Sequence, residues 1–323
     1  MTQDANQKSS FSNLKTKILL GIDGGGSKTI ALVADLKGMI LGRGSSGASN
    51  HLSVGFEAAC MAIEQAIQAA LKAAGLDSEP HPAALCLGLG GAGRPADVQR
   101  FEEFFKSRYP GILLQVTTDA HLALAAGTQE GWGICLICGT GSIAYGRDVQ
   151  GRQVRAGGWG YLFGDEGSGY AIGTAALRAV SQAADGRVPE TLLTRLVLGH
   201  WELDNPMQII PRVYNAPSPR AEIARLAKVV QTAGEQGDMQ AQSILKEAAK
   251  ALAQMAKTIA KHPGFEYPMP LVVAGGVITH DEILFSNFLA SVAEMGLNFT
   301  HIEKVEEPAL GAIRIAQNAF QAF

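Results

Sequence analysis

The sequence predicts an α/β protein built from two similar domains, and three observations support this. The chain has 323 residues, enough for about two domains of roughly 150 residues each. Strand-like apolar runs alternate with helical patterns along most of its length. A pattern of strand, turn, strand, turn, strand in residues 17–44 returns in residues 132–156. We therefore expect each domain to open with a β-meander and to contain a mixed sheet.

In the first half, a glycine turn (DGGGS) separates the strands KILLGI and KTIALVA, and the reversal Asp35–Gly38 leads into MILGRG. Apolar residues at three- and four-residue steps between Phe56 and Leu71 predict a helix that ends near Gly75. Further strands are expected at 83–89 and 112–117, and the sequence AHLALAAG after Asp119 is compatible with a helix.

In the second half, the turns GTGS and Asp148–Gly151 separate the strands WGICLIC, IAYGR and RQVRA. Ser218 and Pro219 predict the N-cap and first residue of a helix that runs through Ala233. Later elements are expected as a helix at 238–261, a strand LVVAGGVI after residue 270, a helix from about 281, a strand at 299–305 and a helix at 308–320. The proline-containing segment 201–219 is expected to be an irregular surface excursion.

These patterns predict a disordered tail at 1–16, an N-terminal domain at 17–128 completed by a helix at about 308–323, and a C-terminal domain at 129–307. The formal net charge of −3 argues against a nucleic-acid-binding surface. No apolar run reaches the 18 or more residues of a membrane span, and the polar N-terminus does not resemble a secretory signal. We expect a cytoplasmic protein.

The four cysteines (Cys60, Cys86, Cys135 and Cys138) all lie in apolar surroundings, which favours reduced core thiols over disulfides. The spacing of Cys135 and Cys138 is that of a metal-binding C-x-x-C pair. Because they lie three residues apart in an expected strand, their side chains point to opposite faces. A structural role is therefore favoured for both.

Glycine is enriched, at 38 of 323 residues, and part of this excess lies in three turns. The turn Asp23–Ser27 contains three consecutive glycines whose N–H groups can surround an anion, and a Mg²⁺ ion would let Asp23 face a phosphate. The turn Gly139–Ser142 holds the matching position in the second half. Each can also be a simple hairpin turn, and Gly275–Gly276 can serve either ligand approach or close packing.

Asp119 is the candidate general base, because an aspartate can take the proton of a hydroxyl during phosphoryl transfer. It is equally well placed to be the N-cap of the following helix. Residues 157–169 combine acids, small residues and aromatics, as a site for sugar hydroxyls requires, and Asp165 and Glu166 are its acids. An exposed acidic turn at a helix start is the alternative.

Five segments in order resemble the N-acetylglucosamine kinase group of the BadF/BadG-type ATPases, within the actin/hexokinase/Hsp70 superfamily. They are Asp23–Thr29, Thr118–Ala120, Gly139–Ser142, Gly164–Ser168 and Ala274–Val277. The resemblance extends from about residue 17 to 316. It implies two duplicated ribonuclease-H-like domains with five-stranded mixed sheets, a central cleft for ATP and sugar, a homodimer and the use of Mg²⁺.

The resemblance also implies roles for individual residues. Asp119 is the catalytic base and a substrate contact, and Asp23 binds magnesium through water. The implied ATP and phosphate contacts are Gly24, Gly25, Gly26, Ser27, Lys28, Thr29, Gly139, Thr140, Gly141, Ser142, Gly275 and Gly276. The implied sugar contacts are Asn50, Gly91, Asp119, Gly158, Asp165 and Glu166.

The implied reaction is phosphorylation of an amino sugar at its 6-hydroxyl, with N-acetylglucosamine as the first choice and glucosamine or N-acetylmuramate as alternatives. A different class is an ATP-driven activator of a 2-hydroxyacyl-CoA dehydratase, which shares the nucleotide fold and holds an iron–sulfur cluster between subunits. Such an activator requires exposed thiolates, whereas the four cysteines are expected to be buried.

Overall fold

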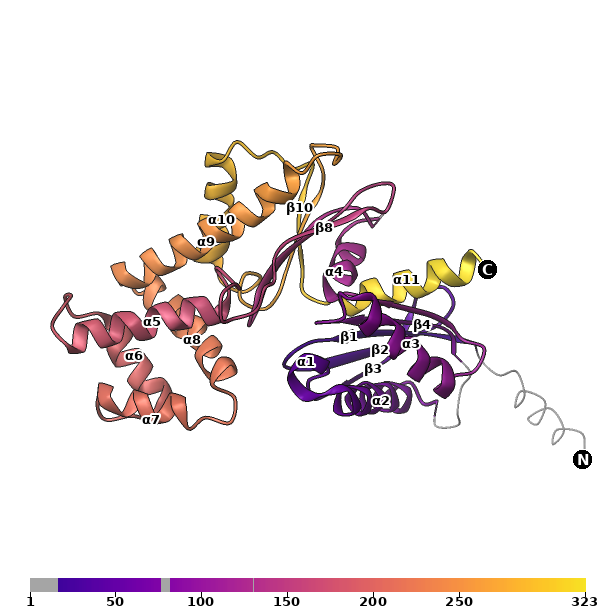
Figure 1. The fold of residues 1–323 in the computed structure, drawn as a ribbon, viewed down its shortest axis with the longest axis horizontal. Helices are drawn as coiled ribbons and strands as arrows, with labels where there is room; N and C mark the ends of the chain where they lie inside the picture. Colours follow the sequence, from indigo (N-terminus) through magenta and orange to yellow (C-terminus); the bar gives the residue numbers. More distant parts are fainter. Residues whose placement is uncertain (1–16, 77–81, 130) are drawn as a thin grey trace, which may run out of the picture. The chain divides into compact units, whose positions relative to one another are not determined.

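The computed structural model describes residues 17–76, 82–129 and 131–323 (Figure 1). The tail expected at 1–16 lies outside these residues. The chain separates into two compact units, one formed by the described residues up to Leu122 together with Ala309–Phe323, the other by Ala123–Pro308. The division falls within the helix α4 (Asp119–Gly127). No helix in the described part of the chain is long and apolar enough to cross a membrane.

The first unit contains a five-stranded mixed sheet of order β3-β2-β1-β4-β5. The strands β1, β2 and β3 pair antiparallel, and β4 and β5 continue parallel to β1. Its elements are β1 (Ile18–Gly24), β2 (Thr29–Ala34), β3 (Ile40–Ser46), α1 (His51–Val54), α2 (Phe56–Ala73), β4 (Pro82–Leu89), α3 (Pro95–Arg108), β5 (Leu113–Thr117) and α11 (Ala309–Gln321).

Helices cover both faces of this sheet because its strands alternate apolar residues to both sides. Leu20 and Ile22 pack with α2 and α3, whereas Leu19 packs with α11 and Leu122 on the opposite face. In Figure 1, α2 and α11 lie on opposite sides of the sheet. The C-terminal helix α11 packs against β1 and β4 of this sheet.

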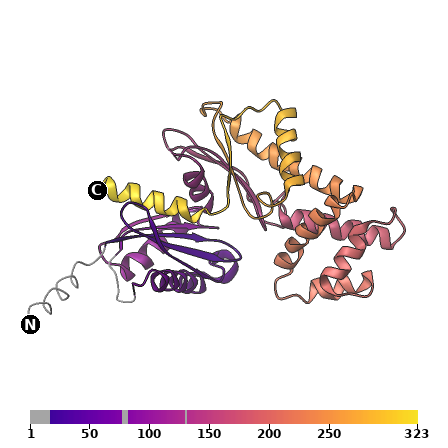
Figure 2. The same cartoon turned by 180° about the vertical axis from the view of Figure 1, so that it is seen from behind.

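The second unit repeats the sheet in the order β10-β9-β6-β7-β8, again with an antiparallel meander followed by parallel strands. Its elements are β6 (Gly133–Cys138), β7 (Ser142–Arg147), β8 (Gln153–Gly157), α5 (Gly169–Ala184), α6 (Leu192–Trp201), a short 3₁₀ helix (Pro206–Gln208), α7 (Ile209–Tyr214), α8 (Pro219–Glu235), α9 (Met239–Ala260), β9 (Leu271–Ala274), α10 (Glu282–Glu294) and β10 (Ile302–Val305). Both views show α5, α6, α7 and α8 gathered in one helical group (Figure 2).

The α/β class and the two mixed five-stranded sheets are confirmed. All four cysteines are reduced and buried, and Cys138 joins the helix-covered core whereas Cys135 does not. Two local expectations are wrong. Segment 201–219 is largely helical, because Asn205 caps the 3₁₀ helix that leads into α7. The strand after residue 270 ends at Ala274, because Gly275 has a φ of +96° and turns the chain away from the sheet.

Candidate active site

Polar residues of the first unit gather at one edge of its sheet. Asp23 lies in β1, Gly90 follows β4, and Asp119 follows β5 after a single residue. These three strands are parallel, so their carboxyl ends lie at the same edge, where α/β proteins bind ligands. The Gly90 N–H donates to the Gly24 carbonyl at 2.8 Å and ties two of the strand ends together.

Three polar atoms surround the position that a Gly90 side chain would take. A Cβ atom there would lie 3.4 Å from Asp119 Oδ2, 3.5 Å from the Gly24 carbonyl oxygen and 3.6 Å from Asn50 Nδ2. Gly91 has a φ of +88°, and a Cβ on it would lie 2.8 Å from Asn50 Oδ1. The structure therefore brings together the predicted sugar contacts Asn50, Gly91 and Asp119 around Gly90.

Asp119 is not the N-cap of α4. Thr118 has that position, because its Oγ1 accepts from the His121 N–H at 3.3 Å and its carbonyl accepts from the Leu122 N–H. The Asp119 carboxylate accepts from the adjacent Ala120 N–H at 2.9 Å. Burial raises the pKa of Asp119 although backbone N–H groups lower it. A carboxylate with a raised pKa is better suited to accept a proton near neutral pH.

Asp23 is electrostatically coupled to Asp119. Burial and the negative charge of Asp119 raise the pKa of Asp23 from 3.8 to about 7, and Lys28 opposes this effect. Two carboxylates so placed fit a divalent cation, which would relieve their repulsion. No three His, Cys, Asp or Glu side chains of the described residues converge as a metal cage.

The first glycine turn is partly structural and partly open. A Cβ on Gly24 would overlap Ser49 and Leu89, whereas Gly26 has no atom within 4 Å of its Cβ position. The Gly25 carbonyl accepts from the Asn50 N–H at 3.1 Å and so anchors the predicted sugar contact. Gly26, Ser27 and Lys28 are exposed and can meet a ligand.

Thr29 differs from its neighbours in this turn. Its side chain is fully buried, and the hydroxyl lies 2.7 Å from the Gly47 carbonyl and 2.8 Å from Ser49 Oγ. The predicted phosphate contact by Thr29 is therefore corrected to a structural role, since its only hydroxyl proton is used inside the protein. Alternation along β2 turned this side chain inward.

His51, which follows Asn50, points away from this group. Its Nε2 lies 3.2 Å from Asp97 Oδ1, and its ring meets Phe101 edge-on at 5.5 Å between centroids. Asn50 itself caps α1, because its Oδ1 accepts from the Leu52 N–H at 3.1 Å. This leaves the Asn50 Nδ2 group directed at the space beside Gly90.

The second glycine turn connects β6 and β7 in the second unit, and backbone hydrogen bonds from the start of α5 hold it in place. The Gly139 carbonyl accepts from the Gly169 N–H at 2.8 Å, and the Thr140 carbonyl accepts from the Tyr170 N–H at 3.2 Å. Ser142 is buried and its hydroxyl donates to the Glu166 carbonyl at 2.7 Å. As with Thr29, a donated bond from the Ser142 hydroxyl to phosphate is excluded by this contact, whereas Gly139 is open.

Of the predicted sugar contacts in the second unit, Asp165 is buried and forms an ion pair. Its Oδ2 lies 3.0 Å from Arg220 Nη2, and its Oδ1 accepts from the Ser142 N–H at 3.4 Å. Burial raises the pKa of Asp165 more than Arg220 lowers it. The Glu166 residue is exposed, and the Gly158 N–H donates to the Ser142 carbonyl at 3.1 Å, which supports the turn.

Arg220 is the residue that sequence reasoning missed at this turn. It comes from the first turn of α8, 55 residues after Asp165. A Cβ added to Gly141 would lie 2.9 Å from both Arg220 Nη2 and Asp165 Oδ2. No sequence motif predicts the contact between Arg220 and Asp165, because it depends on the packing of α8 against α5.

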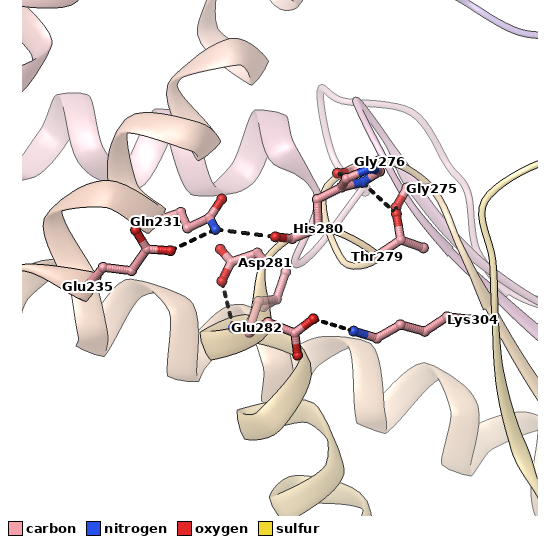
Figure 3. A network of polar contacts seen from close by, with 10 residues as sticks. Gln231, Glu235, Gly275, Gly276, Thr279, His280, Asp281, Glu282 and Lys304 are labelled. Atoms are coloured by element: carbon pink, nitrogen blue, oxygen red, sulfur yellow. Dashed lines mark hydrogen bonds and ion pairs between the residues drawn. The ribbon is translucent and has the colours of Figure 1, made fainter.

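A cavity of about 960 Å³ lies beside the third glycine pair, between α6, α8 and the start of α10. Gly275 serves close packing, since its Cβ would lie 2.5 Å from the Cys138 carbonyl oxygen, whereas Gly276 is open and lines the cavity. Gln231 Nε2 donates to Glu235 at 2.9 Å and to the His280 carbonyl at 3.2 Å (Figure 3). Thr279 donates back to the Gly275 carbonyl at 3.0 Å, so the turn is fixed from both sides.

Comparison with known proteins identifies the family of this chain. Residues 20–316 match the BadF/BadG/BcrA/BcrD ATPase family. The chain belongs to this family. It is 35% identical over 307 residues to an N-acetylmuramic acid/N-acetylglucosamine kinase from Clostridium acetobutylicum. This match covers 94% of the chain and 99% of the relative. It is 32% identical over 317 residues to an N-acetyl-D-glucosamine kinase from Dictyostelium discoideum, with 95% and 99% covered.

Among solved structures, a provisionally named N-acetylglucosamine kinase from Chromobacterium violaceum superposes with a TM-score of 0.74 and 29% identity. The match covers 94% of this chain and 99% of that structure. The ATPase family, the two related sheets and the kinase relatives all describe a chain that uses ATP in a sugar kinase fold.

Proposed function

We propose that this protein transfers the γ-phosphoryl group of ATP to the 6-hydroxyl of an amino sugar, with N-acetylglucosamine as the main substrate. The observation that carries the proposal is the Asp119 carboxylate, which is not used as a helix cap and faces the space beside Gly90 and Asn50. The two kinase relatives, at 35% and 32% identity over nearly the whole chain, support the same substrate class.

In the proposed reaction, Asp119 accepts the proton of the sugar 6-hydroxyl. The bond between that oxygen and the γ-phosphorus forms while the bond from the γ-phosphorus to the leaving oxygen of ADP breaks. The raised pKa of Asp119 helps, because a carboxylate that is too weak a base would hold the proton poorly. Asn50 and Gly91 orient the sugar, with Asp165, Glu166 and Gly158 as the further proposed contacts.

The open parts of the glycine turns are proposed to hold the polyphosphate. Gly25, Gly26, Ser27 and Lys28 act in the first unit, and the Gly139–Gly141 backbone acts in the second. Mg²⁺ bound near Asp23 would supply positive charge to the phosphates. The cavity beside Gly276 is proposed to take the adenosine group, because its volume is in the range of small-molecule sites.

N-acetylmuramic acid is the alternative substrate, because one relative is named as a kinase of both N-acetylmuramic acid and N-acetylglucosamine. The activator alternative has little support. Such a protein needs accessible thiolates, but all four thiols are buried, and desolvation raises the pKa of Cys60 to about 12. Magnesium dependence, a homodimeric state and a cytoplasmic location remain parts of the proposal.

The proposal is tested by measuring ADP release with Mg-ATP and one sugar at a time. The panel contains N-acetylglucosamine, N-acetylmuramate, glucosamine, N-acetylmannosamine and glucose, and each product is weighed by mass spectrometry. We expect the largest kcat/KM with N-acetylglucosamine and a mass gain of one phosphoryl group. ADP release that is the same with and without sugar, and yields no phosphosugar, would reject the kinase function.

A further inference from the structure

Arg220 lies directly over the second glycine turn. Its Nη2 atom is 3.0 Å from Asp165 Oδ2 and 2.9 Å from the position of a Cβ on Gly141. The guanidinium carbon lies 5.3 Å from the centre of the Tyr161 ring. The side chain is thus held by a carboxylate and an aromatic ring in contact with the turn proposed to bind phosphate.

The hydrogen-bonding capacity of this guanidinium is mostly unused. Of its five N–H groups, one has a partner in Asp165, whereas the Nε group is buried without any partner among the described residues. The side chain is still 34% exposed. A buried donor without a partner is costly, so such atoms often belong to a binding site. An anion can approach the exposed part of the Arg220 side chain from solvent.

Arg220 lies at the N-terminus of α8, where an anion would be favourable. Pro219 and Arg220 are the first two residues of this 17-residue helix, and the Ser218 side chain makes no capping bond. The N-terminus of a helix carries partial positive charge, so a cation there is unfavourable without a neighbouring anion. Asp165 pairs with Arg220, and Glu222 in the same first turn pairs with Arg212 and Arg225. A phosphate would add a further anion beside Arg220.

We infer that Arg220 binds the terminal phosphate of the nucleoside triphosphate at the Gly139–Ser142 turn, a contact that no sequence motif announces. Asp165 holds the guanidinium over the turn, and the N–H groups it leaves unused receive the phosphate oxygens. Arginine suits this task because its planar fork matches a phosphate. The inference rests on the proposed use of ATP by this chain.

The competing explanation is that Arg220 acts only through Asp165, as a positioning residue for a sugar contact. The two explanations differ in a measurement that omits the sugar. A phosphate contact affects nucleotide binding by itself, whereas a residue that only positions Asp165 affects sugar binding. Comparison of Arg220→Met with Asp165→Asn separates them.

The experiment measures the affinities of the full chain for a non-hydrolysable ATP analogue and for AMP, by calorimetry with Mg²⁺ and without sugar. The variants are Arg220→Met, Arg220→Lys and Asp165→Asn. Arg187→Met is the matched control, because Arg187 also forms an ion pair with an aspartate, Asp185, at the far end of α5. A double variant, Arg220→Met with Asp165→Asn, removes both charges and guards against loss of folding from an unpaired buried carboxylate.

We expect Arg220→Met to weaken the ATP analogue by at least about tenfold and AMP by less than about threefold. The double variant should show the same loss, Arg220→Lys an intermediate one and Arg187→Met little change. Asp165→Asn keeps an oxygen that can accept from Arg220, so it should lose less affinity than Arg220→Met. Equal weakening of AMP, unchanged binding of the ATP analogue, or an equal loss in Asp165→Asn would overturn the inference. If the unaltered protein binds no ATP analogue, the proposed function itself fails, which is a distinct result.

Discussion

Replacement of Asp23 by asparagine should stabilise the protein, and the gain should depend on pH. The pKa of Asp23 in the folded chain is about 7 instead of 3.8, because the side chain is buried and faces Asp119. At about 1.36 kcal/mol for each pH unit, the ionised form destabilises the fold by up to about 4 kcal/mol. The unfolded chain loses its proton near pH 4 and the folded chain near pH 7. The penalty is therefore absent below pH 4, grows between these values and is complete above pH 7.

The assay is urea unfolding of the unaltered protein and of Asp23→Asn at pH 4.5 and pH 8, without nucleotide or Mg²⁺. We expect a small difference in unfolding free energy at pH 4.5 and a gain approaching about 4 kcal/mol for the variant at pH 8. Glu103→Gln is the control, because Glu103 is an exposed carboxylate on α3 of the same unit. A gain that does not change with pH, or a variant less stable at pH 8, would refute the electrostatic reasoning.

Three further predictions concern the proposed reaction. Asp119→Asn should lower kcat by at least about 100-fold and leave ATP affinity largely unchanged, as measured by steady-state kinetics and calorimetry; near-normal turnover would remove Asp119 from its role. Because Asp119 must be ionised to accept a proton and its pKa is raised, kcat/KM should begin to fall at a pH above the ordinary aspartate pKa of about 4; a profile that stays flat down to that pH would contradict this. Gly276→Leu should weaken ATP binding, measured by calorimetry, without loss of Tm, whereas Gly275→Ala should lower Tm because its Cβ meets the Cys138 carbonyl; unchanged ATP affinity in Gly276→Leu would argue against the cavity as the adenosine site.

The sequence predicts most of the architecture because both sheets are built from local patterns. Apolar strands, a glycine turn and one reversal of the form Asp-x-x-Gly specify each β-meander without reference to distant residues. The apolar pattern does not show where a strand ends when a glycine turn follows it directly. The run LVVAGGVI reads as one apolar strand, but the positive φ of Gly275 ends the strand at Ala274.

Only part of the candidate site could be derived in the same way. The location of Asp23 and Asp119 at strand ends follows from the order of elements, since parallel strands place their carboxyl ends together. The roles of individual turn residues depend on side-chain direction. Thr29 and Ser142 match the residue types of a phosphate turn, but both are buried and donate to carbonyls within the protein.

Contacts between residues far apart in the chain could not be predicted from the sequence. Arg220 meets Asp165 across 55 residues because α8 packs beside α5, and no spacing rule encodes that contact. The competition between Thr118 and Asp119 for the cap of α4 is also decided by backbone geometry. Both are good N-cap residues, and only the structure assigns the cap to Thr118 and leaves the Asp119 carboxylate facing Gly90.

The position of the new phosphate on the sugar shows whether the protein phosphorylates the 6-hydroxyl of N-acetylglucosamine. The protein is incubated with Mg-ATP and N-acetylglucosamine, and the product is analysed by phosphorus–proton correlation NMR, with Asp119→Asn in parallel. We predict a phosphomonoester coupled to the two protons on carbon 6, formed by the unaltered protein and nearly absent with the variant. Inorganic phosphate as the only new phosphorus signal, or a phosphoryl group on another carbon, would contradict the account.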